Sequence, residues 1–209
     1  MAILTPHPAR PAKQYDRGYF DRWYRHPTDR VVTPAALRRR VAWSIATTEY
    51  VLERPIQSVL DGGCGEGHWA PVIRRLRPRA RYTGVDPSPY VVDRYGTRRH
   101  IVRGTITALD ALPLDGSFDL VVCCAMLNYL AASDIMRGLR QIAGQLRGVA
   151  HIELFTRGDP VEGDFRGWRW YSRPWAVRAF RRAGLVPIGL HCYISRERAR
   201  ELCALERGR

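Results

Sequence analysis

Short apolar runs alternate with helical patterns along most of this chain, and that alternation limits the fold more than any other feature. Runs typical of strands lie at residues 57–62, 81–86, 100–104, 118–126, 149–156 and 185–194, and patterns typical of helices lie at residues 35–54, 68–77, 90–95, 133–146 and 174–183. Residues 201–206 are either a strand or the end of a helix. Strands that are apolar on both faces and alternate with helices form a parallel sheet between two helical layers. We therefore predict a doubly wound α/β fold.

Length and composition set the domain organisation and the broad class. With 209 residues, 45% of them hydrophobic, the chain has the size of one domain, which we place at residues 35–209 after an N-terminal helical arm at residues 1–34. No run approaches the roughly 20 apolar residues of a membrane helix, and the N-terminus lacks the order of a signal peptide. We expect a soluble, cytoplasmic protein without a membrane partner, either a monomer or a homodimer.

Cysteine usage and charge narrow the class further. The five cysteines are odd in number and show no C-x-x-C spacing, which argues against a disulfide framework and against a metal site. The formal net charge is +14, and an anionic partner such as RNA or an acidic metabolite would suit it. Lys13 is the only lysine among 34 basic residues, however, and codon bias in a GC-rich genome explains such usage equally well.

A glycine-rich turn follows the first predicted strand. In VLDGGCGEG, Asp61 ends the strand, and the glycines beyond it allow a sharp turn and a close approach of the backbone to a ligand. Asp86 ends the second predicted strand, where it can accept hydrogen bonds from both hydroxyls of a ribose. Together these features predict a nucleoside site. The G-x-G-x-G spacing differs from the G-x-G-x-x-G of nicotinamide dehydrogenases, which stay an alternative.

VLDGGCGEG resembles the first motif of the class I S-adenosylmethionine-dependent methyltransferases, and the resemblance covers about residues 57–156. YTGVDPS is similar to the family's second strand with its ribose-binding acid, and LPLDGSFDLVV is similar to the stretch that leads into its fourth strand. The resemblance implies a Rossmann-like methyltransferase fold with a mostly parallel, seven-stranded sheet. It also implies an enzyme, a methyltransferase, with S-adenosylmethionine as its cofactor.

The same resemblance implies where the cofactor binds. Asp61, Gly63 and Gly65 would border the methionine moiety, and Asp86 would hold the ribose. The residues expected to bind the cofactor are Tyr15, Asp61, Gly62, Gly63, Cys64, Gly65, Asp86, Pro87, Ser88, Thr105, Ile106, Cys124, Ala125 and Tyr129.

The adenine contact departs from the family pattern. Many relatives carry an acidic residue just after the third strand, whereas this chain has Thr105-Ile106-Thr107 there. We expect the adenine to lie against the backbone amide and apolar side of Ile106, with Asp110 as an alternative partner.

The arm and a long loop are expected to bind the methyl acceptor. Tyr15, Tyr19 and Trp23 recur at helical spacing, which predicts either a lid over the cofactor or an aromatic stripe packed on the helical layer. The loop at residues 157–173 is long for an α/β connection and rich in tryptophan and arginine, which suits an acceptor pocket or a subunit interface. The residues expected to bind the substrate are Trp23, Asn128, Arg157, Trp168 and Trp170.

Methyl transfer from a sulfonium requires in-line alignment and exclusion of water, and a base only when the acceptor arrives protonated. Candidate catalytic residues are His191, Glu153 and Tyr19, and His26 is a further candidate base. Glu153 lies in an apolar run, where a carboxylate must be paired or have a raised pKa. His191 lies in the sixth predicted strand, where it is either a base or a core residue.

The acceptor class stays open at this point. We expect a small molecule, anionic or aromatic. The alternatives are an RNA or protein methyltransferase and a non-catalytic, cofactor-binding partner protein. Leu127-Asn128-Tyr129 lacks the prolines of the N-P-P-Y tetrapeptide found in base-amino methyltransferases, so a nucleic-acid target is not favoured.

Overall fold

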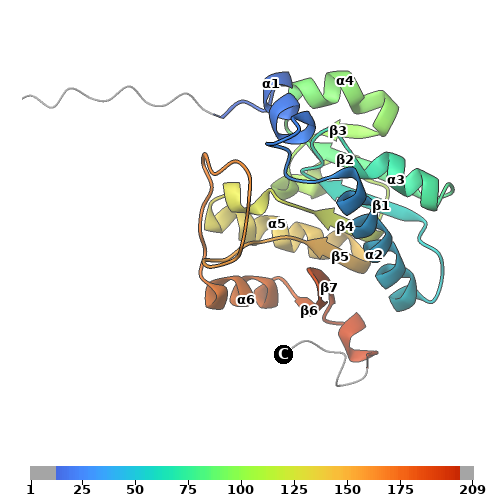
Figure 1. The fold of residues 1–209 in the computed structure, drawn as a ribbon. Helices are drawn as coiled ribbons and strands as arrows, with labels where there is room; N and C mark the ends of the chain where they lie inside the picture. Colours follow the sequence, from blue (N-terminus) through green and yellow to red (C-terminus); the bar gives the residue numbers. More distant parts are fainter. Residues whose placement is uncertain (1–12, 203–209) are drawn as a thin grey trace, which may run out of the picture.

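The computed structural model describes residues 13–202, and within that range seven strands form one sheet (Figure 1). Their order across the sheet is β3-β2-β1-β4-β5-β7-β6. The strands are β1 (Ser58–Gly62), β2 (Arg81–Asp86), β3 (Ile101–Arg103), β4 (Phe118–Cys123), β5 (Leu146–Ile152), β6 (Leu185–Gly189) and β7 (Cys192–Ser195). Pairing is parallel from β3 to β5, and β7 runs antiparallel to both of its neighbours. The predicted doubly wound, mostly parallel, seven-stranded fold is confirmed.

Helices cover both faces of this sheet (Figure 1). Neighbouring residues of β1 point into different cores, since Val59 packs with α2 and α3 residues and Leu60 packs with α5 and α6 residues. Burial on both faces explains why the strands read as continuous apolar runs. The helices are α1 (Arg17–Phe20), α2 (Pro34–Leu52), α3 (Trp69–Leu76), α4 (Pro89–Arg99), α5 (Ala132–Gln145) and α6 (Arg173–Arg182). Shorter helical turns are η1 (Asp21–Arg25), η2 (Ile106–Ala111), η3 (Leu127–Tyr129) and η4 (Arg198–Arg200). None of the helices in the described part of the chain has the length and apolarity that crossing a bilayer requires.

Local capping places two helices beside the sheet's carboxyl edge. The Thr33 hydroxyl accepts the N–H of Ala36 at 3.1 Å, so α2 begins directly after the arm. The Ser88 hydroxyl accepts the N–H of Val91 at 3.3 Å, so α4 begins three residues after Asp86. In both cases a proline follows the cap, where its missing N–H costs nothing.

A buried acid at the start of β4 joins three segments. Asp119 is fully buried and accepts hydrogen bonds from Arg54, from the N–H of Gln57 and from Arg147 at 2.7 to 2.9 Å. Burial opposes its ionisation, but these donors hold its pKa below the ordinary value. Asp119, the second aspartate of the LPLDGSFDLVV stretch, is therefore structural.

The predicted strand at residues 185–194 is wrong, because the structure has a hairpin there. β6 ends at Gly189, and Leu190 and His191 form the turn into β7 with φ of 46° and 65°. A two-residue turn with positive φ at both positions normally contains glycine or asparagine. Because Leu and His occupy these positions, the sequence does not predict the turn. β4 and β5 also end earlier than predicted, at Cys123 and Ile152.

The two ends of the chain lie partly outside the described residues. Residues 1–12 of the predicted arm and residues 203–206 of the last predicted segment fall there. Glu201 and Leu202, the described part of that last segment, lie in neither a strand nor a helix.

Candidate cofactor and acceptor site

The glycine-rich turn after β1 requires glycine for conformation and for space. Gly63 and Gly65 have φ of 72° and 52°, in the left-handed region. A Cβ on Gly63 would lie 2.8 Å from the side chain of Met126, and one on Gly65 would lie 2.9 Å from the hydroxyl of Tyr24. Side chains of other segments therefore reach the backbone of this turn.

Asp86, at the end of β2, is fixed by the backbone on both sides. One carboxylate oxygen accepts the N–H of Gly65 at 2.8 Å, and the other accepts the N–H of Ser88 at 2.9 Å. Burial raises the pKa of Asp86, and these two backbone hydrogen bonds oppose that rise. Each oxygen keeps a lone pair for a further donor, as two ribose hydroxyls would require.

Asp61, at the end of β1, is a second buried acid beside Asp86. It is 3% exposed, and its carboxylate accepts a hydrogen bond from the Tyr82 hydroxyl at 2.7 Å. Burial raises the pKa of Asp61 to about 7, the hydrogen bond from Tyr82 opposes this, and the charge of Asp86 adds to it. No basic side chain in the described structure is among the groups that shift either pKa. A cationic ligand would supply the missing positive charge.

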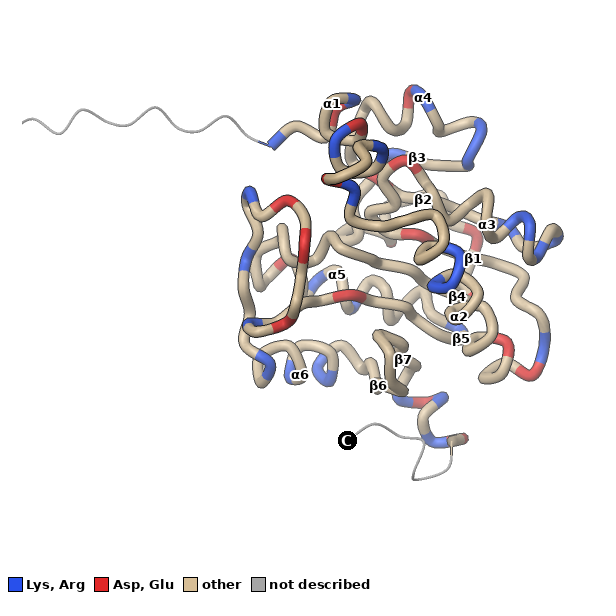
Figure 2. Tube along the Cα trace, viewed as in Figure 1, with Lys and Arg blue, Asp and Glu red and all other residues tan. Residues whose placement is uncertain are grey.

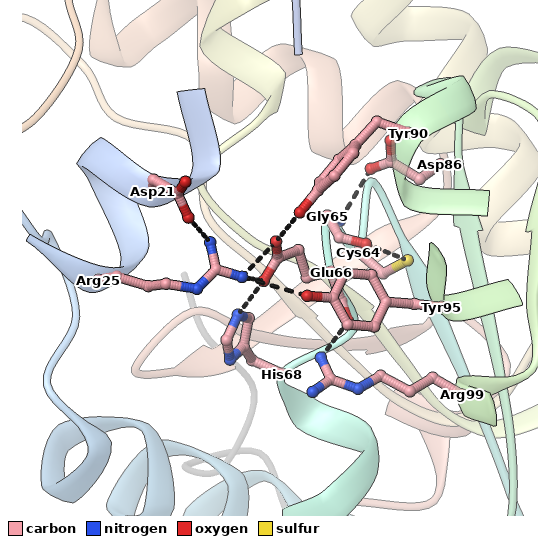
Figure 3. Close-up of polar contacts among 10 residues, drawn as sticks. All are labelled: Asp21, Arg25, Cys64, Gly65, Glu66, His68, Asp86, Tyr90, Tyr95 and Arg99. Atoms are coloured by element: carbon pink, nitrogen blue, oxygen red, sulfur yellow. Dashed lines mark hydrogen bonds and ion pairs between the residues drawn. The ribbon is translucent and has the colours of Figure 1, made fainter. Parts of the chain in front are cut away.

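The N-terminal arm is tied to the glycine-rich turn through Glu66 (Figure 3). Arg25 Nη2 lies 2.6 and 2.5 Å from the two carboxylate oxygens of Glu66, which is fully buried. Tyr90 donates to the same carboxylate at 3.2 Å, and His68 Nε2 lies 3.3 Å from it. Burial by itself would raise the pKa of Glu66, but the contacts from His68 and Arg25 outweigh it and lower the pKa to about 2.

Aromatic side chains of the arm cover the same corner. Phe20 is 2% exposed and stacks on Tyr90 with ring centres 5.8 Å apart. Phe20 and Tyr24 both lie within about 3 Å of a Cβ built on Gly65. The Ser88 hydroxyl donates to the carbonyl of Tyr15 at 2.6 Å, so the start of the arm also lies beside the predicted ribose site.

Two adjoining cavities open at the carboxyl edge of the sheet. The smaller, of about 230 Å³, lies over the glycine-rich turn and is lined by residues that include Asp61, Gly63, Cys64 and Cys124. The larger, of about 710 Å³, lies between the arm, the end of β5 and the loop before α6. Ala125, with φ of 54°, is among the residues that line both.

The lining of the larger cavity combines aromatic and charged side chains. Arg40, His151 and Glu153 belong to it, as do Glu162 and Asp164 of the long loop. Arg40 Nη1 lies 3.0 Å from the Glu153 carboxylate, which is 3% exposed. The aromatic wall residues are Tyr19, Trp23, Tyr24, Tyr129, Phe155, Phe165 and Trp168.

A model of the methyltransferase domain family matches residues 21–204, which is most of the chain. This chain belongs to that family. Among curated proteins, an uncharacterized protein of Synechococcus is 30% identical over 107 residues, which cover 47% of this methyltransferase chain and 25% of the relative. The chain therefore spans about a quarter of the length of the curated relative it matches.

Solved methyltransferases share the fold of this family member. One of them is an amino pentose methyltransferase of calicheamicin biosynthesis from Micromonospora echinaspora, solved with S-adenosylmethionine bound. It superposes on this chain with a TM-score of 0.57 at 16% sequence identity, and the match covers 72% of this chain and 84% of that one. Magnesium protoporphyrin IX methyltransferase from Synechocystis, solved with S-adenosylhomocysteine, has a TM-score of 0.55 at 15% identity, covering 87% and 96%. The predicted family and the Rossmann-like methyltransferase fold are confirmed.

Most residues predicted to bind the cofactor gather at one corner of this methyltransferase domain. Asp61, Gly63 and Cys64 line the smaller cavity with Cys124 and Ala125. Tyr15, Pro87 and Ser88 line a shallow neighbouring pocket at the start of α4, and Tyr129 lines the larger cavity.

The predicted adenine contacts lie beside the turn but line none of these three pockets. Ile106 is 1% exposed, and a Cβ on Gly62 would come within 2.6 Å of its side chain, so Ile106 is a core residue beneath the turn. Thr105 is exposed, with its hydroxyl 2.8 Å from that of Thr107. Asp110 is exposed at the surface.

The predicted substrate-binding residues divide into two groups. Trp23 and Trp168 line the larger cavity, as expected of acceptor contacts. Arg157 and Trp170 are exposed and lie outside its lining, and Trp170 stacks on Phe165 instead.

Asn128, also predicted to bind the substrate, lies outside the lining of the larger cavity. Its amide nitrogen donates to the carbonyls of Phe155 and Arg169 at 2.8 and 2.9 Å, and its amide oxygen accepts the N–H of Phe155 at 3.0 Å. Asn128 is 1% exposed, so its side chain holds the loop in place.

The three predicted catalytic residues all reach the larger cavity. The placement of His191 in a strand is wrong, because it is an exposed turn residue. Glu153 follows β5 and is paired with Arg40, the structural ion pair that its buried position required. Burial raises the pKa of Tyr19 far above its ordinary value, so Tyr19 stays protonated at neutral pH.

Sequence reasoning missed His151, Arg40, Arg25 and Glu66. A signal existed for His151, because residues two apart on a strand share a face and His151 precedes Glu153 by two within an apolar run. Nothing in the sequence pairs Arg25 with Glu66, which lies 41 positions away.

Proposed function

We propose that this chain binds S-adenosylmethionine across the ends of β1 and β2 and transfers its methyl group to a small molecule in the larger cavity. The observation that carries the proposal is the pair of adjoining cavities, one over Asp61 and the glycine-rich turn, the other enclosed by aromatic side chains. A volume of about 710 Å³ is within the range of small-molecule sites.

The residues at the turn fit this cofactor. Asp86 has two oriented carboxylate oxygens for the ribose hydroxyls, and Asp61 is a buried acid in need of a cation. The ammonium and sulfonium of the methionine moiety are both cations. When bound, S-adenosylmethionine supplies a methyl group on a positively charged sulfur, and the protein has to align the acceptor and exclude water.

The lining of the larger cavity favours an aromatic acceptor over an anionic one. The charge of Arg40 is already matched by Glu153. Trp23, Tyr129 and Trp168 offer ring faces and edges on which a flat molecule can stack.

A nucleic-acid acceptor has less support. Figure 2 shows Lys and Arg spread over α3, α4, α6 and the arm instead of gathered on one element. Binding to RNA would require a continuous basic surface.

We further propose that residues 13–34 act as a lid. Lys13 Nζ lies 2.7 Å from the carboxylate of Asp164 in the long loop and 3.6 Å from the ring centre of Tyr129. Together with the ion pair between Arg25 and Glu66, this contact would hold the arm over both cavities. Closure would keep water from the reacting atoms.

Calorimetry and a turnover assay test the proposal. We expect S-adenosylhomocysteine to bind with measurable heat and NAD to give none. We also expect S-adenosylmethionine to be converted to S-adenosylhomocysteine when flat aromatic hydroxyl compounds are supplied, and not when RNA is supplied. Absence of heat with S-adenosylhomocysteine would overturn the proposal, and tight binding without turnover on any acceptor would favour a non-catalytic partner protein.

A further inference from the structure

A further cavity, which we call the α6 cavity, has a volume of about 690 Å³ and lies between α6 and the hairpin of β6 and β7. These elements lie side by side at one edge of the sheet (Figure 1). The segment after β5 separates the α6 cavity from the larger cavity, because successive side chains of an extended segment point to opposite sides. Glu153 and Phe155 line the larger cavity. Leu154 and Thr156 line the α6 cavity, so the two cavities are distinct sites.

Much of the lining of the α6 cavity is apolar. The rings of Phe180, on α6, and Tyr193, on β7, stack with centres 4.1 Å apart and planes 3° from parallel. Leu185, at the start of β6, is buried in the same lining, whereas Val177 on α6 is 55% exposed. Apolar surface is therefore left open to solvent along this helix. Covering it would favour the binding of an apolar ligand.

Three arginines of the same lining have no acidic partner. They are Arg173, Arg181 and Arg196, and none of them forms a salt bridge within the described part of the chain. Arg196 Nη2 donates to the carbonyl of Arg181 at 3.1 Å. This contact holds Arg196, which follows β7, at the end of α6 that carries Arg181. Two positive charges that no acid matches attract an anion to this end of the cavity.

The single acid of the lining lies near the other end of α6. Asp159 accepts the N–H and the hydroxyl of Thr156 at 2.7 and 3.1 Å. Thr156 in turn pairs with Tyr171, two residues before α6 begins at Arg173. A helix rises about 1.5 Å per residue, so Arg181 lies about 12 Å further along α6 than Arg173. The α6 cavity thus has a basic end without an acid, and the apolar residues of α6 lie next to it.

We propose that the α6 cavity is a binding site for an amphipathic anion, an alkyl carboxylate. Its carboxylate binds Arg181 and Arg196, and its chain lies along α6 over Phe180 and Val177. A guanidinium suits a carboxylate because its N–H groups can donate two parallel hydrogen bonds. The volume of about 690 Å³ is in the range of small-molecule sites. This inference goes beyond the proposed methyl transfer and does not depend on it.

Three probes test the proposal on the wild-type protein by titration calorimetry. Octanoate has an alkyl chain and a carboxylate, octan-1-ol has the chain alone, and acetate has the carboxylate alone. We expect octanoate to bind at least about tenfold more tightly than octan-1-ol, because the alcohol lacks the charge that pairs with the arginines. We expect acetate to give no measurable heat. Equal binding of octanoate and octan-1-ol, or of octanoate and acetate, would overturn the proposal.

Two neighbouring arginines of α6 provide matched variants. Arg181 lines the cavity and Arg182 does not, while both are exposed and lie in the last turn of the helix. We expect Arg181→Met to weaken octanoate binding about 5- to 10-fold and Arg182→Met to change it less than about twofold. Arg196→Met should act as Arg181→Met does. Equal losses in Arg181→Met and Arg182→Met would show that the general positive charge of the chain attracts octanoate, and this would overturn the site.

Methyl NMR of the unsubstituted protein locates the bound probe. With octanoate, the signals of Val177 and Val186, which line the α6 cavity, should shift, and the signal of Val31, which lines the larger cavity, should not. A shift at Val31 without shifts at Val177 and Val186 would place octanoate in the larger cavity and overturn the proposal.

Absence of heat with octanoate would also overturn the proposal, and a dimer in light scattering would then point to a second copy of the chain on this face. None of these results bears on the proposed function, because octanoate is titrated without cofactor and the proposed function is tested by the binding of S-adenosylhomocysteine.

Discussion

The guanidinium of Arg25 reaches both carboxylate oxygens of Glu66, at 2.6 and 2.5 Å, and so joins the N-terminal arm to the glycine-rich turn (Figure 3). Glu66 is fully buried, whereas the side chain of Arg25 is 40% exposed. The arm therefore supplies the counter-charge for an acid inside the predicted cofactor site. Any movement of the arm that admits a ligand has to break this pair.

Arg25→Met removes that counter-charge and keeps most of the side-chain volume. We expect the free energy of unfolding to fall by about 1–3 kcal/mol and backbone hydrogen exchange at residues 17–25 to accelerate, because Glu66 loses its main partner. Arg17→Met is the matched control, since Arg17 is 78% exposed and 3.4 Å from Asp21, and it should cost less than about 0.5 kcal/mol. Equal effects in urea unfolding and exchange would show that the pair does not hold the arm.

Asp86→Ala removes the acceptor that the structure fixes at the end of β2. We expect affinity for S-adenosylhomocysteine to fall by about 30-fold or more, because two hydrogen bonds to a charged group are lost. Asp110→Ala, at the exposed alternative site, should leave the affinity unchanged. Titration calorimetry measures the affinity of both variants. A larger loss of affinity in Asp110→Ala than in Asp86→Ala would show that the ribose does not bind at Asp86.

The affinity for S-adenosylmethionine should depend on the protonation of Asp61. Its pKa is raised to about 7, and a cationic ligand favours the ionised carboxylate. We expect binding to be about tenfold weaker at pH 6 than at pH 8. The Asp61→Asn variant serves as the control, because any pH dependence that it keeps comes from titration of the ligand or of other groups. If its affinity depends on pH as strongly as that of the wild type, Asp61 is not the cause of the pH dependence.

Asp61→Asn should also change the pH dependence of stability. An unfolded aspartate titrates near 3.8 and the folded one near 7, so in this interval the native state holds the extra proton. The contribution of Asp61 to the free energy of unfolding therefore falls as pH rises from about 4 to 7 and stays low above it. We expect the Asn variant to unfold at a higher temperature than the wild type at pH 8, with a smaller difference at pH 5. Thermal unfolding at both values tests the sign.

A substitution in the turn between β6 and β7 should stabilise the protein. Leu190 is 69% exposed and has φ of 46°, a conformation that asparagine adopts more readily than leucine. Leu190→Asn should stabilise the protein by about 0.5–1 kcal/mol in urea unfolding. Leu190→Ala also removes the leucine side chain, but alanine does not tolerate positive φ as asparagine does, so this variant should not be more stable than the wild type. If alanine does raise the free energy of unfolding, the cause is the removal of exposed apolar surface.

Where local rules apply, the site could be predicted from the sequence. Asp61 is the last residue but one of β1 and Asp86 is the last residue of β2, its parallel neighbour, so they meet at one edge of the sheet whatever the rest of the chain does. Asn128 shows the limit of this reasoning, because its position beside the site was clear but its backbone partners in the loop were not. The turn at Leu190 was missed because its residues carry none of the usual turn signals.

The sequence by itself determined the order of strands and helices from α2 to α6, the glycine-rich turn and the acid beside it, because these depend on periodicity and on conformations that few residues allow. Only the tertiary structure decided that the Ser44 hydroxyl lies 2.9 Å from His151 Nδ1, and that Arg25 neutralises Glu66. Ser44 and His151 are 107 positions apart. Such contacts follow from the packing of whole layers, and no local pattern in the chain encodes which side chains those layers bring together.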